Sequence, residues 1–368
     1  MKIAIVHELL IKLGGAERVV DVFQQMFPDA PIFTLLYDEK KCGSVFPKEK
    51  VVSSSLNKYY KVGMPMSFLR TKMPQAIEEF NFNEYDLVIS SSSAFAHGIL
   101  TDTGTKHLCY CHSPMRYVWD YFFEIQKENP SKKAMIQYFG HKLRQWDYIA
   151  SSRADQVIAN SHTVQKRIGK FWNKDSKIIF PPVDTERFIP NNTNEGYFLI
   201  VSALQPFKRI DVAIEAFRGI PKHKLVVIGD GSERSYFEKI APKNVEILGI
   251  KSDKVVQEYM LNTRALIFPG VEDFGIVPIE AMASGKPVIA LNSAGVKETV
   301  IDGETGVFFN QQDPESLLDG IARFLELEKN FDYQKIRLHA EQFSKENFKK
   351  QFLAEVKKLI GKVWKVID

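Results

Sequence analysis

Residues 265–287 read Ala265-Leu-Ile-Phe268-Pro-Gly-Val-Glu272-Asp-Phe-Gly275-Ile-Val-Pro278-Ile-Glu280-Ala-Met-Ala-Ser-Gly285-Lys-Pro287. The apolar run 265–268 predicts a buried strand, residues 270–275 a loop, and residues 276–284 a short helix. Pro278 suits the first turn of that helix, where its missing N–H is not needed, and Gly285 suits the position just beyond the end. A buried strand that leads through a loop into a helix is typical of a parallel α/β domain.

Two glutamates flank the start of this helix, Glu272 before it and Glu280 within it. The unpaired backbone N–H groups of a helix N-terminus favour an anion such as a diphosphate, whereas carboxylates accept hydrogen bonds from neutral hydroxyls. A ligand that carries both kinds of group is a sugar nucleotide. The alternative is that two exposed acids lie near a helix start, where acids are favoured in any case.

Outward from this stretch, short β-branched runs alternate with helical patterns, which is typical of parallel sheets covered by helices. The first series of expected strands is 2–7, 86–90, 107–111, 156–159 and 177–180, and the second is 198–202, 224–228, 245–248, 265–268, 287–291 and 306–309. A polar, proline-containing stretch over 181–196 suits a linker between the two series. We therefore predict two doubly wound domains, with ligands bound outside the carboxyl ends of the strands in a central cleft.

Composition and charge exclude several classes of protein. The chain has 368 residues, 45% of them hydrophobic, which is enough for two cores, and its formal net charge of +4 is too small to indicate nucleic-acid binding. Its three cysteines form neither a disulfide framework nor a zinc pattern. No run of 18 uncharged apolar residues occurs, and Met1-Lys2 leads directly into the first expected strand, so we expect a cytoplasmic protein.

Two further loops carry features that suit phosphate binding. Gly14-Gly15 lies between the first strand and an expected helix over 16–27, where a phosphate can approach the backbone, although a glycine turn that only starts a helix is the alternative. The spacing of a dinucleotide fingerprint is missing. Lys208-Arg209 follows the strand 198–202 and can neutralise a diphosphate, unless both are simply solvated charges.

A histidine follows the strand 107–111, in the string His112-Ser-Pro-Met-Arg-Tyr-Val-Trp-Asp120. Catalytic groups of open α/β sheets lie at such strand ends, and a neutral imidazole there can hydrogen-bond a sugar close to its reacting carbon. The alternative is a strand-end histidine whose hydrogen bonds are satisfied by the backbone.

Taken together, these segments resemble the retaining glycosyltransferases of family 4, which have the GT-B fold, over nearly the whole chain. Glu272 and Glu280 match the E-x7-E signature, with Phe274-Gly275 and Glu280-Ala-Met-Ala-x-Gly-x-Pro around it, and His112-Ser-Pro114 matches the His-x-Pro that contacts the donor sugar. The longer string 112–120 and Ser90-Ser-Ser-Ser-Ala-Phe-Ala-His-Gly98 look like a bacterial subset linked to GDP-mannose and surface-polysaccharide assembly.

The resemblance implies a role for each matched residue and no cofactor. Glu280 would bind the ribose and Lys208 the diphosphate, while His112, Glu272 and Lys208 would form the catalytic set. The substrate-binding backbone would come from Gly14, Gly15, Phe274, Gly275, Ile276 and Val277. An arginine common in the family is Ala203 here, so Arg209 is expected to replace its charge. The chain contains no Asp-x-Asp, which favours a metal-independent reaction assisted by the departing phosphate.

We therefore expect a transferase that moves a hexose, mannose from GDP-mannose, to a glycan or a lipid-linked glycan. A sugar-nucleotide 2-epimerase on the same fold and a non-catalytic sugar-nucleotide-binding subunit remain alternatives. The expected domains are 1–190, joined by a C-terminal helix over 346–368 that crosses back to it, and 191–345. The apolar stripe of that helix is Phe348, Phe352, Val356, Leu359 and Val363.

The segment Lys58–Met73 carries four cations, no acid and many apolar side chains. Such a segment can rest on an anionic membrane surface, which would place the protein peripherally at the inner face of the membrane. A loop buried against the same domain is the alternative.

Overall fold

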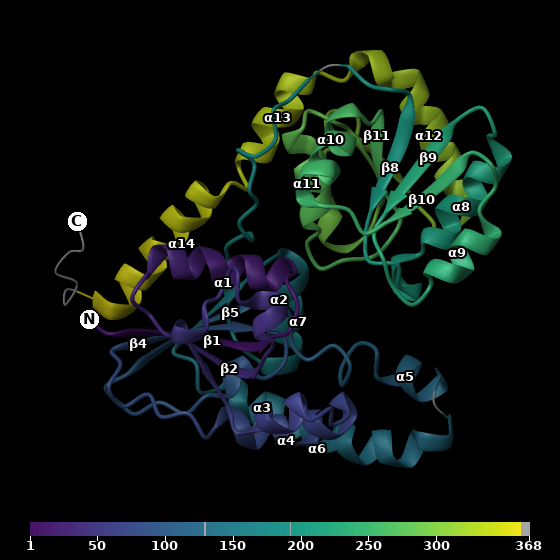
Figure 1. The fold of residues 1–368 in the computed structure, drawn as a ribbon. Helices are drawn as coiled ribbons and strands as arrows, with labels where there is room; N and C mark the ends of the chain where they lie inside the picture. Colours follow the sequence, from purple (N-terminus) through teal and green to yellow (C-terminus); the bar gives the residue numbers. More distant parts are fainter. Residues whose placement is uncertain (129, 192, 362–368) are drawn as a thin grey trace. The chain divides into compact units, whose positions relative to one another are not determined.

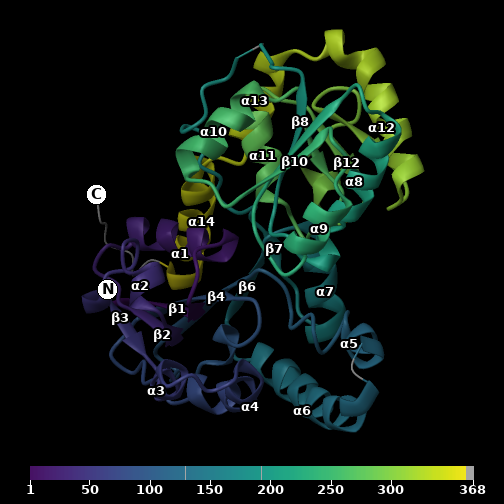
Figure 2. The same ribbon diagram turned by 45° about the vertical axis from the view of Figure 1, so that its right-hand side comes forward.

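The computed structural model describes residues 1–128, 130–191 and 193–361. The chain divides into two compact units. The first contains Met1–Pro182 together with the chain from Phe348 onward, and the second contains Val183–Asn347. Figures 1 and 2 show a sheet flanked by helices in each unit.

The first unit is built on a seven-stranded parallel sheet in the order β3-β2-β1-β4-β5-β6-β7. The strands are β1 (Ile3–Leu10), β2 (Ile32–Tyr37), β3 (Val51–Ser53), β4 (Leu87–Ser92), β5 (Lys106–Cys111), β6 (Gln156–Ala159) and β7 (Lys177–Ile178). All five expected strands are present. β2 and β3 were not predicted, because a short buried run and a three-residue edge strand give no clear periodicity.

Helices cover both faces of this sheet. They are α1 (Gly15–Met26), α2 (Glu39–Cys42), α3 (Leu56–Lys61), α4 (Met66–Ile77), α5 (Phe122–Glu128), α6 (Lys133–Ser151), α7 (His162–Trp172) and α14 (Lys345–Ile360). On one face, Phe352 of α14 packs 4.6 Å from Phe23 of α1, measured between ring centroids. On the other face, α4 contributes Leu69 and Met73 to a second core.

The C-terminal helix returns to the first domain as predicted. Phe348, Phe352 and Val356 are buried in the core of the first unit, and Leu359 packs against that core. The final part of the expected helix, with Val363, lies outside the described residues. An apolar stripe facing the core with lysines on the outside is the usual pattern of a docked amphipathic helix.

The second unit has a six-stranded parallel sheet in the order β10-β9-β8-β11-β12-β13. The strands are β8 (Tyr197–Val201), β9 (Lys224–Ile228), β10 (Val245–Gly249), β11 (Ala265–Phe268), β12 (Val288–Leu291) and β13 (Gly306–Phe309). All six were expected, within one residue at each end. The helices are α8 (Ile210–Gly219), α9 (Arg234–Ile240), α10 (Asp253–Asn262), α11 (Ile276–Ala283), α12 (Pro314–Leu327) and α13 (Tyr333–Glu341).

Each sheet has one topological switch point, at which the chain reverses the direction in which it adds strands. In the first sheet β1 lies between β2 and β4, and in the second β8 lies between β9 and β11. Ligands of doubly wound sheets bind beyond the carboxyl ends of the strands at such a switch point, where the two following loops part. The candidate ligand-binding loops are therefore those after β1 and β4 and those after β8 and β11.

No helix within the described ranges 1–128, 130–191 and 193–361 is long and apolar enough to cross a membrane.

Candidate functional site

The loops after β8 and β11 bring together Lys208 and Glu272, which are two of the predicted catalytic residues. The ammonium of Lys208 forms an ion pair with Oε1 of Glu272, and both side chains are partly exposed. Gly270 allows this approach, because a Cβ there would lie 3.2 Å from Cα of Lys208. The switch point of the second sheet thus carries one cation and one carboxylate in contact.

The helix that follows this loop begins as the sequence predicted. Gly275 caps α11 with φ of 90°, a conformation that an L side chain rarely adopts. Ile276 and Val277 form its first turn, so their N–H groups belong to those that a helix leaves without an internal partner. Gly295 backs the loop, since its N–H donates to the carbonyl oxygen of Glu272 at 3.0 Å.

Glu280 is buried on α11 and pairs with an arginine that the sequence analysis did not select. Nη2 of Arg187 lies 3.2 Å from Oε1 of Glu280, and Nη1 lies 3.3 Å from Oδ2 of Asp253. A buried carboxylate is costly unless it is paired, so Arg187 explains how Glu280 is tolerated at 3% exposure. No sequence signal links the two, because they are 93 positions apart.

Arg209 is engaged within its own domain. It adopts φ of 52°, donates through Nε to Oδ1 of Asp211 at 3.1 Å, and donates through Nη1 to Gln312 at 3.3 Å. Gln312 in turn donates to the carbonyl oxygen of Pro269 at 2.9 Å. Part of the charge of Arg209 is therefore already balanced, and its side chain connects the loops after β8 and β11. Its contact with a diphosphate stays a prediction.

In the first unit, His112 directly follows β5. Its Nε2 lies 2.8 Å from the hydroxyl of Ser91 at the end of β4. Burial lowers the pKa of His112 to about 4, with a smaller contribution from the charge of His7. The imidazole is therefore neutral at pH 7, as the expected role requires.

The Gly14-Gly15 turn starts α1 with Gly14 as its N-cap. The backbone at Gly14 is extended, with φ of −137°, a conformation that any residue can adopt. A glycine is favoured at this position because it leaves space for a neighbouring side chain. A Cβ there would lie 2.9 Å from Oε2 of Glu17, which accepts the N–H of Gly14 at 2.8 Å. That N–H already has an intramolecular partner, and phosphate binding at Gly14 and Gly15 stays a prediction.

A buried carboxylate at the switch point of the first sheet, that of Glu8, was not predicted from the sequence. Oε1 of Glu8 accepts the hydroxyl of Ser92 at 3.0 Å and the four N–H groups of residues 93–96 at 2.6 to 3.2 Å. Burial alone would raise the pKa of Glu8, but the charge of His7 and these N–H groups lower it. Glu8 therefore fixes the loop after β4. The sequence signal that could have identified Glu8 is the charged pair His7-Glu8 within an otherwise apolar strand that begins at Ile3.

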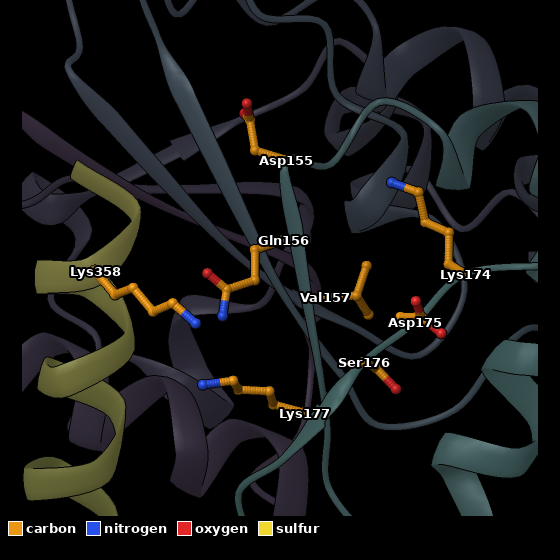
Figure 3. A pocket seen from close by; sticks show the side chains of 8 residues that line it. All are labelled: Asp155, Gln156, Val157, Lys174, Asp175, Ser176, Lys177 and Lys358. Carbon is orange, nitrogen blue, oxygen red and sulfur yellow. The ribbon is translucent and has the colours of Figure 1, made fainter. Parts of the chain in front are cut away.

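A separate pocket lies at the opposite ends of the strands of the first unit. Figure 3 shows its lining, which comprises Asp155, Gln156, Val157, Lys174, Asp175, Ser176, Lys177 and Lys358. Gln156 and Lys177 begin β6 and β7, whereas His112 follows the far end of β5. Lys177 is already paired with Glu355 at 2.5 Å. This pocket is therefore remote from the candidate site of the first unit.

The part of the chain that the structure describes contains no evident metal site. No group of three or more His, Cys, Asp or Glu side chains there is arranged to hold a metal ion.

Comparison with known proteins assigns the family. The model described as "Glycosyltransferase Family 4" matches residues 13–187, and the model described as "Glycosyl transferases group 1" matches residues 183–346. The uncharacterized glycosyltransferase MJ1178 of Methanocaldococcus jannaschii is 31% identical over 58% of this chain, and the chain spans 61% of that protein. The alpha-1,3/1,6-mannosyltransferase ALG2 of Dictyostelium discoideum is 25% identical over 84% of this chain and 86% of its own length.

Solved structures support the fold. Anabaena Alr3699/HepE in complex with UDP matches with a TM-score of 0.71 and 18% identity, over 97% of this chain and 100% of that one. Sucrose-phosphate synthase of Thermosynechococcus elongatus matches with a TM-score of 0.74 and 18% identity, over 98% and 99% of the two chains. With its two parallel α/β sheets and its returning C-terminal helix the chain has the GT-B fold, and it belongs to glycosyltransferase family 4.

Proposed function

We propose that this protein is a retaining transferase that moves mannose from GDP-mannose to a glycan or a lipid-linked glycan. Mannosyltransferases named ALG2 from Dictyostelium and several yeasts, 25 to 27% identical over at least 81% of this chain, support mannose as the sugar. A 41.2 kDa protein in the cps region of Klebsiella pneumoniae, 26% identical over 71% of this chain, supports a role in polysaccharide assembly. The choice of GDP rests on the resemblance of residues 112–120.

The observation that carries the proposal is the Lys208–Glu272 pair at the switch point of the second sheet, beside the N-terminus of α11. The ammonium and the helix N–H groups can stabilise the charge that develops on a departing diphosphate. The carboxylate of Glu272 can accept hydrogen bonds from the sugar hydroxyls. Catalysis would then consist of positioning and charge stabilisation, with no protein nucleophile and with the departing phosphate assisting deprotonation of the acceptor.

Glu280 would hold the ribose of the nucleotide. A carboxylate can accept several hydrogen bonds at once, so the ion pair with Arg187 is compatible with a contact to ribose hydroxyls. Arg187 would also fix the orientation of the Glu280 side chain before the ligand arrives. Its guanidinium packs 4.7 Å from the ring centroid of Phe188, which limits its own freedom.

The acceptor would be presented at an anionic membrane surface. The cations at 58, 61, 70 and 72 are exposed, and so are the apolar side chains of Val62 and Phe68, while Leu69 and Met73 anchor α4 in the core. Figures 1 and 2 show α6 beside α4, and α6 exposes Met135, Tyr138 and Phe139 close to Lys132 and Lys133. Exposed apolar side chains interleaved with lysines favour the interface of a negatively charged bilayer.

Nucleotide release tests the reaction. The protein would be incubated with GDP-mannose, with and without a lipid-linked glycan extract, and free GDP and the glycan products would be measured. We expect GDP to form only when the acceptor is present and the glycan to gain one mannose. An altered sugar nucleotide without any acceptor would favour the epimerase alternative. Binding with no turnover under either condition would favour the non-catalytic subunit.

A further inference from the structure

A continuous line of polar contacts joins His112 to the Gly14 turn inside the first unit. The register of the sheet places His7 of β1 opposite Ser91 of β4. Nδ1 of His7 lies 3.0 Å from the carbonyl oxygen and 3.1 Å from the hydroxyl of Ser91, and that hydroxyl lies 2.8 Å from Nε2 of His112. On the other side, Nε2 of His7 lies 3.6 Å from Oε1 of Glu17, which holds the N–H of Gly14.

The carbonyl group at the centre of this line fixes the protons on His7. A carbonyl oxygen can only accept, so Nδ1 of His7 must carry a proton. Nε2 of the same ring faces the carboxylate of Glu17, and the carboxylate of Glu8 lies 3.9 Å from Nδ1. Burial alone would lower the pKa of His7, but the contact with Glu17 and the charges of both glutamates raise it above its ordinary value. The two carboxylates therefore favour the protonated form of His7.

The protons on His112 follow from those on His7. Because Nδ1–H of His7 points at the oxygens of Ser91, the hydroxyl proton of Ser91 is directed to Nε2 of His112. In the opposite assignment both imidazoles would donate to the hydroxyl of Ser91, and its own proton would have no acceptor among the described contacts of this buried side chain. Burial keeps His112 neutral at pH 7, so its one proton lies on Nδ1. The structure gives Nδ1 of His112 no hydrogen-bond partner among the residues it describes.

We propose that Ser91, His7 and Glu17 are positioning residues that hold His112 as its Nδ1–H tautomer, so that Nδ1 donates a hydrogen bond to an oxygen of the nucleotide sugar. The role given to His112 rests on the proposed function, whereas the tautomer rests on the contacts alone. In the other tautomer Nδ1 presents a lone pair, which can accept from a sugar hydroxyl but repels oxygens that carry no proton, such as those of a phosphate or of the sugar ring. Glu17 also holds the Gly14 turn, so one carboxylate orients both elements.

The arrangement has a defined pH range. The groups that face His7 are Glu8 on its own strand, Glu17 from α1, His112 after β5, and the carbonyl and hydroxyl of Ser91 from β4. His112 is neutral above its pKa of about 4, so the fixed tautomer is present above that value. It does not require the charge of His7, because Nδ1 of His7 keeps its proton toward the carbonyl oxygen of Ser91 when Nε2 loses its own.

Nitrogen NMR of the full-length protein labelled with ¹⁵N-histidine tests the proton assignment directly. At pH 7 we expect a protonated Nδ1 and an unprotonated Nε2 for His112, and a protonated Nδ1 for His7. Ser91→Ala should return His112 to a mixture of tautomers, and His339 of the second unit serves as an internal control. A protonated Nε2 on His112, or an unprotonated Nδ1 on His7, in the wild-type protein would overturn the proposal without any variant.

Kinetics test the positioning role. Glu17→Gln and Ser91→Ala should each lower kcat about 10- to 100-fold, the range seen when groups that orient a ligating histidine are removed, and should change KM for GDP-mannose less. Glu17→Gln should also leave a larger fraction of His112 as the Nε2–H tautomer in the nitrogen NMR spectrum, because His7 loses the carboxylate that faces its Nε2. Unchanged kcat and an unchanged tautomer would refute the positioning role. If the NMR result holds and no donor is turned over, the proposed function fails and the tautomer assignment stands.

Discussion

The strand-end loops of the two units hold their charges in different ways. In the second unit Lys208 and Glu272 are 16% and 28% exposed and form an ion pair with each other. The ammonium of Lys208 also lies 5.3 Å from the ring centroid of Phe207. In the first unit Glu8 is 4% exposed and is bound by four backbone N–H groups. Charges that water can reach can exchange partners with a ligand at little cost, whereas a buried and fully bonded charge supports the structure.

A second buried carboxylate lies deeper in the first unit. Asp147 of α6 is fully buried, and Oδ2 of its carboxylate accepts the indole N–H groups of Trp119 and Trp172 at 2.8 and 2.7 Å. Burial raises the pKa of Asp147, with the charge of His97 and the indole donors acting in the opposite direction. This carboxylate ties the loop after β5 to α6 and α7. We therefore expect substitutions in the first unit's buried set to lower stability, and those at the second unit's pair to lower activity.

The largest effect is expected at Glu8. Replacing it with glutamine leaves several N–H donors of residues 93–96 poorly satisfied and removes a carboxylate beside His7. The free energy of unfolding should fall by about 3–5 kcal/mol, the cost of removing one partner from a buried charged network. Denaturant unfolding at pH 7 measures it, with the exposed Glu49→Gln as control, which should change stability by less than about 0.5 kcal/mol.

The difference in stability between wild type and Glu8→Gln should depend on pH, with a sign set by the pKa of Glu8. The pKa of Glu8 is lowered in the folded protein, so its contribution is present above its unfolded pKa and is lost as the pH falls through the folded value. Wild type should therefore lose stability on acidification more steeply than Glu8→Gln. Equal stability of the two proteins at pH 7 would mean that Glu8 does not support the loop.

A smaller effect, on activity alone, is expected at Lys208. Lys208→Met removes the cation that would stabilise the departing diphosphate and should lower kcat about 10²- to 10³-fold. Because Glu272 is partly exposed, water screens its lost partner and the free energy of unfolding should change by less than about 1 kcal/mol. Lys239→Met, an exposed lysine of α9 in the same unit, is the matched control for turnover. A Lys208→Met protein with normal kcat would break the contrast between the two units.

The two glutamates of the E-x7-E motif should separate affinity from turnover. Glu280→Gln should weaken binding of the donor about tenfold with little change in kcat, because the ribose is remote from the bond that breaks. Glu272→Ala should mainly lower kcat. Steady-state kinetics distinguish the two, and Asp253→Asn controls for loss of the exposed partner of Arg187. The assignment fails if both variants keep wild-type values.

The smallest effect concerns the membrane. Each lysine or arginine near an anionic surface contributes about 1 kcal/mol, so changing Lys58, Lys61, Arg70 and Lys72 to serine should release the protein from vesicles rich in phosphatidylserine. Wild-type binding should also fade in high salt. Four exposed lysines of the second unit changed to serine, at positions 222, 239, 243 and 251, provide a control with the same change in net charge. Equal co-sedimentation of the two variants would show that these four cations do not hold the protein at a membrane.

The sequence predicted best what is encoded locally. Strands β8 to β13 were all expected, because each is a short apolar run bounded by glycine, proline or polar residues, and Glu272 and Glu280 belong to one contiguous motif. Arg187 and Ser91 could not be found in this way. Arg187 meets Glu280 across 93 positions, and Ser91 meets His7 across 84, so both contacts depend on strand order and register. The E-x7-E motif predicts the ligand class, whereas the fold supplies the partners of its two carboxylates.

Calorimetric titration of GDP-mannose into the full-length protein in excess EDTA tests the central claim most directly. We predict saturable binding with one site per chain, because Lys208 and the N-terminus of α11 supply the positive potential that a metal ion would otherwise provide. Glu280→Gln should weaken it about tenfold, or about 1.4 kcal/mol. Absence of binding in EDTA that manganese restores, or equal affinity in wild type and Glu280→Gln, would contradict the account.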